Sequence, residues 1–455
     1  MTRSAESAGR PWQGRLDALR RRYGVVGAQF GIVRLDAVGR QVDHVAVASG
    51  LADVDRATSV TNETLFEIGS ITKMWTGILI LQLVAEGTLS LDTPVRDVIP
   101  QFTLRDPDAA ASVTIRMLLS HTSGIEGDLF TDTGEGDDSV ERYVASLRSA
   151  RALHPAGARF SYCNAGFVIA GRIVEVMRGA RWSDVVAERI VAPLGLTHTT
   201  ADRDAAARLP LAAGHTSSAS RDQQVARGRI PRALAPAGLI ASNARDMLAF
   251  AGMLLRDGGP RHGVLAAASA AAMRQVQVDL DEVPVASAAW GLGAMLENWD
   301  ATSAWGHDGA TIGQKAYLRL LPDRRTAAVL LTSGGRPDGL FRELFEQVAT
   351  RYADASLPPT LSAMGRLGAV PQRSYGFEDA GAELSADGEG ALLTVIEPSE
   401  TGGEPRRSTF ELYESSVPGV WAWTTPDLAG WAPLRPVDGG AYLGLRFLPA
   451  RELIR

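Results

Sequence analysis

The longest apolar segment of the chain, ITKMWTGILILQLVAEG at residues 71–87, places the strongest constraint on its fold. Its length and composition predict a helix, and Gly87 is the kind of residue that ends a helix as its C-cap. No segment reaches the about 18 uninterrupted apolar residues of a membrane-spanning helix. The helix is therefore expected in the interior of a soluble protein.

The segments around this helix predict an α+β domain. Strands are expected near both ends of the domain and helices in its middle, which favours one antiparallel sheet that joins the two ends. The expected strands are 28–35, 43–50, 288–297, 303–309, 314–322 and 326–333, and the expected helices begin near Arg15 and cover 139–150, 164–178, 182–192, 243–256 and 337–353.

The character of the chain changes near Asp354. The segment DASLPPTLSA contains turn residues and two adjacent prolines, as linkers do. Short strand-like runs separated by Gly, Pro and Asp follow it and predict a small antiparallel barrel or sandwich. We expect a first domain at 1–355, a linker at 356–363 and an all-β domain at 364–455, whose core includes Trp421, Trp423 and Trp431.

The basic residues are almost all arginines. Of the 46 lysines and arginines, only Lys73 and Lys315 are lysines. An arginine stays protonated in proteins, whereas the pKa of a lysine can be lowered until it acts as a base. We attribute the scarcity of lysine to coding bias, so the neighbours of each lysine must decide whether it has a function.

Lys73 lies three residues after Ser70, at the start of the apolar helix. This spacing places the two side chains on one face, about one turn apart. A serine hydroxyl becomes a good nucleophile when a nearby base takes its proton, and a lysine desolvated by an apolar helix can be that base. The backbone N–H of Ser70, at the helix N-terminus, is a candidate donor to an oxyanion.

Two further motifs carry candidate site residues. Tyr162 and Asn164 follow a turn segment and precede an apolar helix, so a phenol and an amide can point into one site. His307 and Gly309 lie on an expected strand. Histidine titrates near neutrality, and the glycine would let a substrate lie close to the strand backbone.

Together, GSITK at 69–73, YCN at 162–164 and HDG at 307–309 resemble the serine β-lactamase and penicillin-binding-protein superfamily, in its class C, esterase and D-peptidase branch. Supporting matches such as TIRMLLSHTSGI and PAGLIASNARDM extend the resemblance over roughly residues 15–355. It implies a transpeptidase-like fold with a helical subdomain. It also implies Ser70 as nucleophile and Lys73 as the base beside it, with Tyr162 sharing protons and activating the deacylating nucleophile, and Asn164 binding a substrate amide. Which of Lys73 and Tyr162 removes the serine proton stays open, because coupled groups share their titration.

The same resemblance implies the remaining site residues, with two departures. His307 stands where many β-lactamases have a lysine, which weakens the attraction for the carboxylate of a penicillin. Leu239 stands where relatives often have a glycine, which should reshape one wall of the pocket. The second oxyanion donor would be the backbone N–H of Ala310, and Arg446 of the C-terminal domain is a candidate to reach the cleft, although a surface position is the alternative.

Several acyl-transfer activities remain open within this superfamily. A β-lactamase or wall carboxypeptidase should be exported, whereas the polar N-terminal stretch lacks the apolar run of a signal peptide and favours a cytoplasmic location. The overall build resembles stand-alone penicillin-binding-protein-type thioesterases, which cyclise nonribosomal peptides delivered by a peptidyl carrier protein. Such enzymes typically accept a D-residue at the acylating end, and the C-terminal domain would be a lipocalin-like barrel that shields the acyl-enzyme from water.

The alternatives are an esterase, a D-amino acid-specific peptidase or a catalytically inactive lactam- or peptide-binding sensor. No cofactor is expected. The single cysteine, Cys163, excludes an internal disulfide, and the histidines form no metal-binding pair. The net charge of −6 and the scattered arginines argue against nucleic acid. Lys315 is assigned to a strand surface or sheet edge, His121 to a structural role beside the site, and the acidic segment 126–143 to a solvated loop near the cleft mouth.

Overall fold

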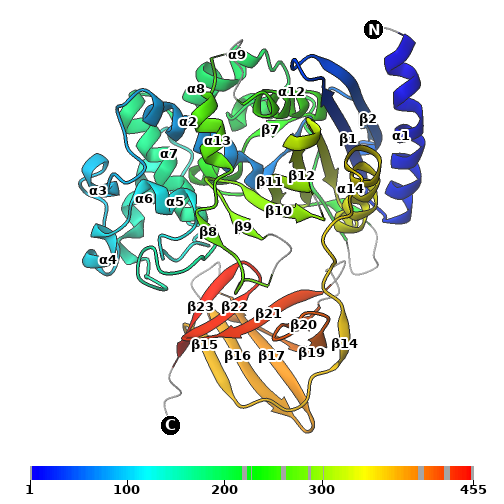
Figure 1. Cartoon of the computed structure of the whole chain (residues 1–455). Coiled ribbons are helices and arrows are strands. Elements are labelled where there is room, and N and C mark those ends of the chain that lie inside the picture. Colours follow the sequence, from blue (N-terminus) through cyan, green and yellow to red (C-terminus); the bar gives the residue numbers. More distant parts are fainter. Residues whose placement is uncertain are drawn as a thin grey trace.

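The chain folds into two domains, each built on its own large β-sheet (Figure 1). The computed structural model describes residues 3–217, 223–226, 228–257, 263–284, 288–300, 302–397, 404–424 and 431–451. The first domain combines an antiparallel sheet with helices, and the second is all β. The predicted order of an α+β domain and an all-β domain is confirmed.

The sheet of the first domain joins its two ends. Nine antiparallel strands follow the order β3-β2-β1-β13-β12-β11-β10-β9-β8, so β1 (Gly27–Leu35) pairs with β13 (Thr326–Ser333). The prediction of one strand over 288–297 is wrong, because a turn at Gly293, with a φ of 76°, separates β9 from β10. The other strands are β2 (Gln41–Asp53), β3 (Thr58–Ser59), β8 (Val278–Asp279), β9 (Ala289–Trp290), β10 (Met295–Trp299), β11 (Thr302–Thr311) and β12 (Gln314–Leu321).

Helices cover both faces of this sheet (Figure 1). Phe30 of β1 packs with α1 (Arg3–Arg22) and α14 (Pro337–Ala353), whereas its neighbour Gly31 lies against α12 (Ala244–Leu255). Successive residues of a strand point to opposite faces, which explains the division. The shorter helices are α3 (Val95–Val98), α4 (Pro107–Ala111), α5 (Ile115–Leu119), α6 (Ser139–Ser146), α8 (Trp182–Val186), α9 (Ala192–Leu194), α10 (Arg203–Ala206), α11 (Ala235–Gly238) and α13 (Ala267–Met273).

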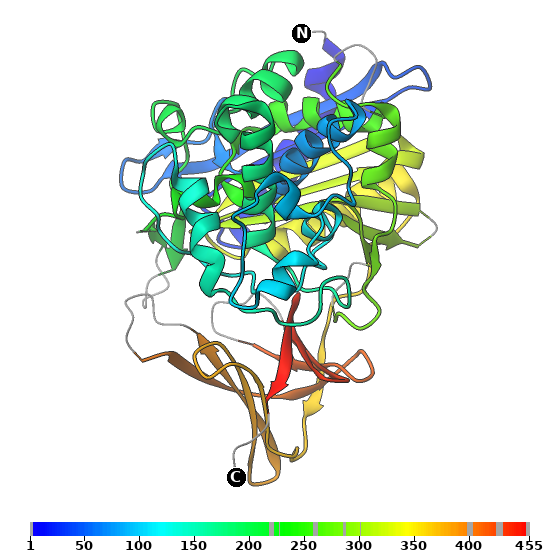
Figure 2. The ribbon, with the colours of Figure 1, turned by 90° about the vertical axis from the view of Figure 1, so that its left-hand side faces the viewer.

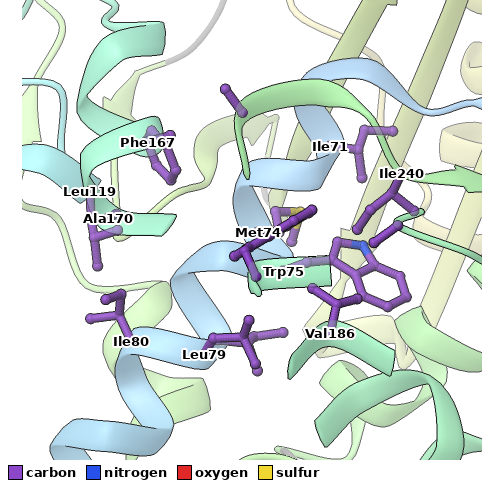
Figure 3. Packing of buried hydrophobic residues seen from close by; sticks show 14 of the residues in the cluster. Ile71, Met74, Trp75, Leu79, Ile80, Leu119, Phe167, Ala170, Val186 and Ile240 are labelled. Carbon is purple, nitrogen blue, oxygen red and sulfur yellow. The ribbon is translucent and has the colours of Figure 1, made fainter. Parts of the chain in front are cut away.

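The apolar segment forms α2 (Thr72–Ala85), which is buried on nearly all sides (Figure 3). Side chains of α7 (Asn164–Arg178) lie on one side of it, and Val186 and Ile240 lie on the other. Gly87 has a φ of 73°, and the turn that it forms closes the C-terminus of the helix, as predicted. None of the described helices is long and apolar enough to cross a bilayer.

The second domain is a nearly closed barrel of ten strands. Its sheet follows the order β14-β19-β20-β21-β22-β23-β15-β16-β17-β18. Leu412, between β18 and β19, accepts from Leu367 N–H and donates to Ala391 O, which brings the two ends of the sheet together. The strands are β14 (Ala363–Arg366), β15 (Arg373–Gly376), β16 (Gly381–Asp387), β17 (Gly390–Glu397), β18 (Arg406–Glu411), β19 (Tyr413–Ser415), β20 (Trp421–Trp423), β21 (Ala432–Val437), β22 (Gly440–Leu443) and β23 (Arg446–Arg451).

The expected tryptophan core of the barrel is only partly present. Trp421 and Trp423 are partly buried against a core of leucines and alanines, and Trp431 contacts the ring of Tyr413. The barrel turns its β22–β23 hairpin toward the first domain (Figures 1 and 2). Arg151 and Asp379 add an ion pair between the domains, with a shortest N–O distance of 2.7 Å.

Candidate active site

Ser70 and Lys73 are in contact at the start of α2. Ser70 belongs to a 3₁₀ turn, η1 (Gly69–Ile71), that runs directly into the helix. The two side chains share one face, as their spacing predicts, and Lys73 Nζ lies 2.8 Å from Ser70 Oγ. Nζ also donates to Ala237 O of α11 at 2.8 Å, which holds the amine beside the hydroxyl.

Burial prepares Lys73 to act as a base. Its side chain is 0% exposed, and burial lowers its pKa from the usual 10.5 to about 7. The rings of Tyr162 and Phe167 lie over Nζ, with centroids 5.0 and 5.7 Å away. The described structure gives this amine no carboxylate partner, so near neutral pH a large fraction of it is unprotonated.

Tyr162 is held beside Ser70 by His121. The two rings stack with centroids 4.2 Å apart, and His121 Nδ1 accepts from the backbone N–H of Cys163. The structural role predicted for His121 is therefore confirmed. Tyr162 is hydrogen-bonded to the Ser70 side chain, and burial raises the pKa of its phenol. Tyr162 is therefore a neutral phenol at neutral pH.

His307 faces the same site as a neutral ring. It is 2% exposed and meets Trp290 edge-on, with centroids 5.4 Å apart. Burial, reinforced by the charge of Lys73, lowers the pKa of His307 to about 3. The prediction that His307 titrates near neutrality is therefore wrong, because the sequence does not reveal how deeply the strand is buried.

A buried ion network lies behind His307. Arg319 of β12 is 3% exposed and makes a bidentate pair with Glu297 of β10, with N–O distances of 2.8 and 2.9 Å. Its remaining nitrogen donates to Asp308 at 2.6 Å. Arg319 therefore links the three strands β10, β11 and β12 directly beneath the HDG motif.

The two proposed oxyanion donors lie on segments that pack closely together. A Cβ added to Gly309 would fall 1.9 Å from Ile68 O and 3.1 Å from Ser70 N, and one added to Gly69 would fall 2.4 Å from Ala310 N. Only glycines let η1 and β11 approach this closely. The pairing of β10 with β11 stops at Gly306, and η1 lies against the strand beyond that point.

Asn164 is connected to a residue that the sequence did not single out. Its Nδ2 donates to Asp128 Oδ1 at 2.8 Å, and the other oxygen of Asp128 forms an ion pair with Arg446 of the barrel. Arg446 therefore reaches the cleft and is not confined to the barrel surface. Asp128 lies in the acidic segment interpreted as a solvated loop, where nothing in the sequence distinguishes it from six neighbouring carboxylates.

Two predicted positions, Leu239 and Lys315, remain. Leu239 follows α11, is buried, and lines a small cavity together with Val140 and Arg232. Its effect on the wall of the substrate pocket stays a prediction. Lys315 is exposed on β12 and pairs with Asp338 at 2.8 Å, as expected for a strand surface. Among the described residues, no cluster of His, Cys, Asp or Glu could hold a metal ion.

Comparison with known proteins identifies the family. The Beta-lactamase family matches residues 12–352, most of the chain. The chain belongs to this family. Within the beta-lactamase family, it is 40% identical to penicillin-binding protein 4 of Amycolatopsis lactamdurans over 352 residues, which cover 76% of this chain and 91% of that protein.

Solved structures extend the similarity to both domains. SurE superposes with a TM-score of 0.73 and 26% identity and covers 98% of this chain and 100% of SurE, which has also been solved with D-Leu. A class C beta lactamase from Rhodobacter sphaeroides has a TM-score of 0.60 and 22% identity over 75% of this chain and 99% of its own, which shows the shared fold. The family and the contact between Ser70 and Lys73 identify an acyl-serine hydrolase or transferase.

Proposed function

We propose that this chain is a peptide cyclase. It takes a nonribosomal peptidyl thioester from a carrier protein onto Ser70 and releases it by head-to-tail macrolactamisation, with a D-residue at the acylating end. The observation that carries the proposal is the barrel docked on the active site, where Leu445 O accepts from the backbone N–H of Tyr162 at 3.0 Å. Such a cover supports release by an amine, because it limits the access of water to the acyl-enzyme.

The side chains supply the acylation step. Neutral Lys73 takes the proton of Ser70 as Oγ attacks the thioester carbonyl, and the N–H groups of Ser70 and Ala310 stabilise the oxyanion. Lys73 then returns the proton to the departing pantetheine thiolate. Lys73 is favoured over Tyr162 as the base of this step near neutral pH, because burial raises the pKa of the phenol.

The release step uses the same groups, with the proton now moving toward Ser70 Oγ. The amine at the other end of the peptide attacks the Ser70 ester, and its surplus proton passes through Lys73 and Tyr162 to Ser70 Oγ as the amide forms. A cavity of about 300 Å³ lies where the domains meet, lined by Asp128, Tyr162, Trp423 and Arg446 among others. It offers room for part of the folded peptide beside the ester.

The electrostatics of the site support a substrate without an essential carboxylate. His307 is neutral, so it does not replace the charge of the lysine that many β-lactamases have at this position. Similarity to SurE, solved with D-Leu, supports a D-configured acyl residue. A carrier-bound thioester would place the enzyme in the cytoplasm.

An esterase or a D-amino acid-specific peptidase is the second candidate, because a neutral pocket beside an activated serine also suits a small ester or amide. A lactam- or peptide-binding sensor is less well supported. The Lys73 amine, with a pKa near 7 and 2.8 Å from Ser70 Oγ, is an arrangement for catalysis that a binding protein does not need.

Three acyl donors separate these functions. The protein is offered a peptidyl thioester with a C-terminal D-residue, a chromogenic ester and a cephalosporin, and mass spectrometry follows acylation of Ser70 and the products, with S70A as the control. A cyclic peptide supports the proposal. Free acid alone, together with rapid ester turnover, would favour the esterase, and no acylation by any donor would favour the sensor.

A further inference from the structure

The C-terminal hairpin Gly440–Arg451 is hydrogen-bonded to the segment that carries Tyr162. Besides the bond from Tyr162 N–H to Leu445 O, the hydroxyl of Tyr442 donates to Phe160 O at 3.0 Å. These bonds fix the backbone of the hairpin against the active site. They place the side chain of the next hairpin residue, Arg446, at the cleft.

Asp128 is held against the start of α7 by the backbone of the preceding residue, Gly127. Gly127 O accepts from Ala165 N–H at 3.1 Å, and a Cβ added to Gly127 would lie 2.6 Å from Cys163 Cα. Only a glycine permits this approach. The position of Asp128 is therefore determined by the same α7 turn that presents Asn164.

The carboxylate of Asp128 determines how Asn164 faces a substrate. An ionised carboxylate only accepts hydrogen bonds, so the Nδ2 end of the amide must face Asp128. The Oδ1 atom and the second N–H hydrogen of Asn164 are left for a substrate amide. Without Asp128, the amide could turn over and lose this preference.

Arg446 balances the charge that this arrangement requires. The side chain of Asp128 is 28% exposed and that of Arg446 is 42% exposed, so both are partly withdrawn from water. Without the guanidinium, the carboxylate beside Asn164 would lose the ion pair that balances its charge. The barrel therefore supplies the charge that holds Asp128 in place.

We propose that Asp128 is a positioning residue that links the C-terminal domain to the active site. Arg446 holds Asp128, and Asp128 holds the amide of Asn164 in the orientation that binds a substrate amide. The barrel is then part of the substrate-binding apparatus in addition to being a cover. This inference rests on the acyl-serine chemistry of the proposed function but not on cyclisation.

Two esters test the link. One is an N-acyl amino acid p-nitrothiophenyl ester, which carries an amide for Asn164, and the other is p-nitrophenyl acetate, which carries none. We expect D128A to lower kcat/KM for the first ester about three- to tenfold, mainly through KM, because one positioned hydrogen bond is lost. The second ester should react at the wild-type rate.

A double-mutant cycle separates positioning from general damage. N164A should cause a similar loss, and D128A/N164A should be no worse than either single variant, because both act through one amide. D128N should restore only part of the activity, since its Oδ1 can still accept from Asn164 but the charge that pairs with Arg446 is lost. D132A, in the same acidic segment, is the matched control. Additive losses, or equal losses for both esters, would overturn the proposal.

The two proposals fail differently. If D128A and N164A show this coupling while no cyclic peptide forms from a carrier-bound thioester, the positioning role stands and the cyclase proposal does not. If a cyclic peptide forms but D128A affects both esters equally, Asp128 only stabilises the fold and the cyclase proposal is unaffected.

Discussion

Replacing Lys73 by methionine should abolish acylation and remove a pH dependence from the stability of the protein. Burial lowers the pKa of Lys73 from 10.5 to about 7, while the unfolded chain keeps the usual value. Between these two values, the unfolded state holds a proton that the folded state has released. Wild-type stability must therefore rise with pH across this window, and the K73M variant lacks this contribution.

The expected size follows from the two pKa values. At about 1.4 kcal/mol per pH unit, moving the pKa from 10.5 to about 7 corresponds to roughly 5 kcal/mol. Because Lys73 is still partly protonated in the folded state at pH 7, about 3 to 4 kcal/mol of this should appear between pH 7 and pH 10. K73M also loses the hydrogen bonds to Ser70 and Ala237 O, about 1 kcal/mol each, which shifts the whole curve without changing its slope.

Urea unfolding followed by tryptophan fluorescence at several pH values measures this difference directly. The quantity of interest is the free energy of unfolding of the wild type minus that of K73M, because other titrating groups then cancel. K315M is the matched control, since Lys315 is the other lysine and lies on an exposed strand surface. This variant shows how much of the difference comes from removing a lysine as such.

The rate of acylation gives a second readout. If Lys73 must be unprotonated to take the proton of Ser70, acylation should rise with pH, reach half its maximum near pH 7 and level off above it. A wild-type-minus-K73M difference that stays flat from pH 7 to pH 10 would refute the reasoning. So would an acylation rate that reaches half its maximum only near pH 10.

Three further predictions test the strand β11 and the buried ion network beside it. In a stopped-flow assay, G309A should lower the rate of acylation by about 100-fold or more, because the new Cβ would push the strand away from η1 and misplace an oxyanion donor. The control G365A, whose Cβ meets open space, should leave this rate unchanged. R319M should destabilise the protein by about 3 to 5 kcal/mol in urea unfolding, because it leaves Glu297 buried without its partner. H307N should leave the acylation midpoint near pH 7 unchanged, because a histidine with a pKa of about 3 does not titrate in this range.

The sequence predicted those parts of the site that depend on local spacing. Ser70 and Lys73 meet because three residues make about one turn of a helix, and the burial of Lys73 follows from the apolar composition of α2. The sheet that joins both ends of the first domain also followed from the order of strands and helices. These features need no knowledge of which distant segments meet.

The parts that sequence reasoning missed depend on contacts between distant segments. Asp128 lies 36 residues before Asn164 and over 300 residues before Arg446, and no spacing rule brings the three together. The pKa of His307 depends on the burial of its ring beside Trp290, which a strand pattern does not reveal. The strand pattern also does not reveal the ion pairs of Arg319, because its partners come from two other strands.

These distant contacts give the site a charge pattern that bears on its substrate. At neutral pH, Tyr162 and His307 are neutral, Lys73 is only partly protonated, and Asp128 and Arg446 balance one another. Among the described residues, these groups leave no fixed, unpaired cation beside Ser70 with which to attract a carboxylate. Binding must then rely on hydrogen bonds to amides and on shape, and a peptidyl thioester offers both without a charge next to its reacting carbonyl. The electrostatics therefore support an acyl group joined to its carrier as a neutral thioester over a free acid or a penicillin.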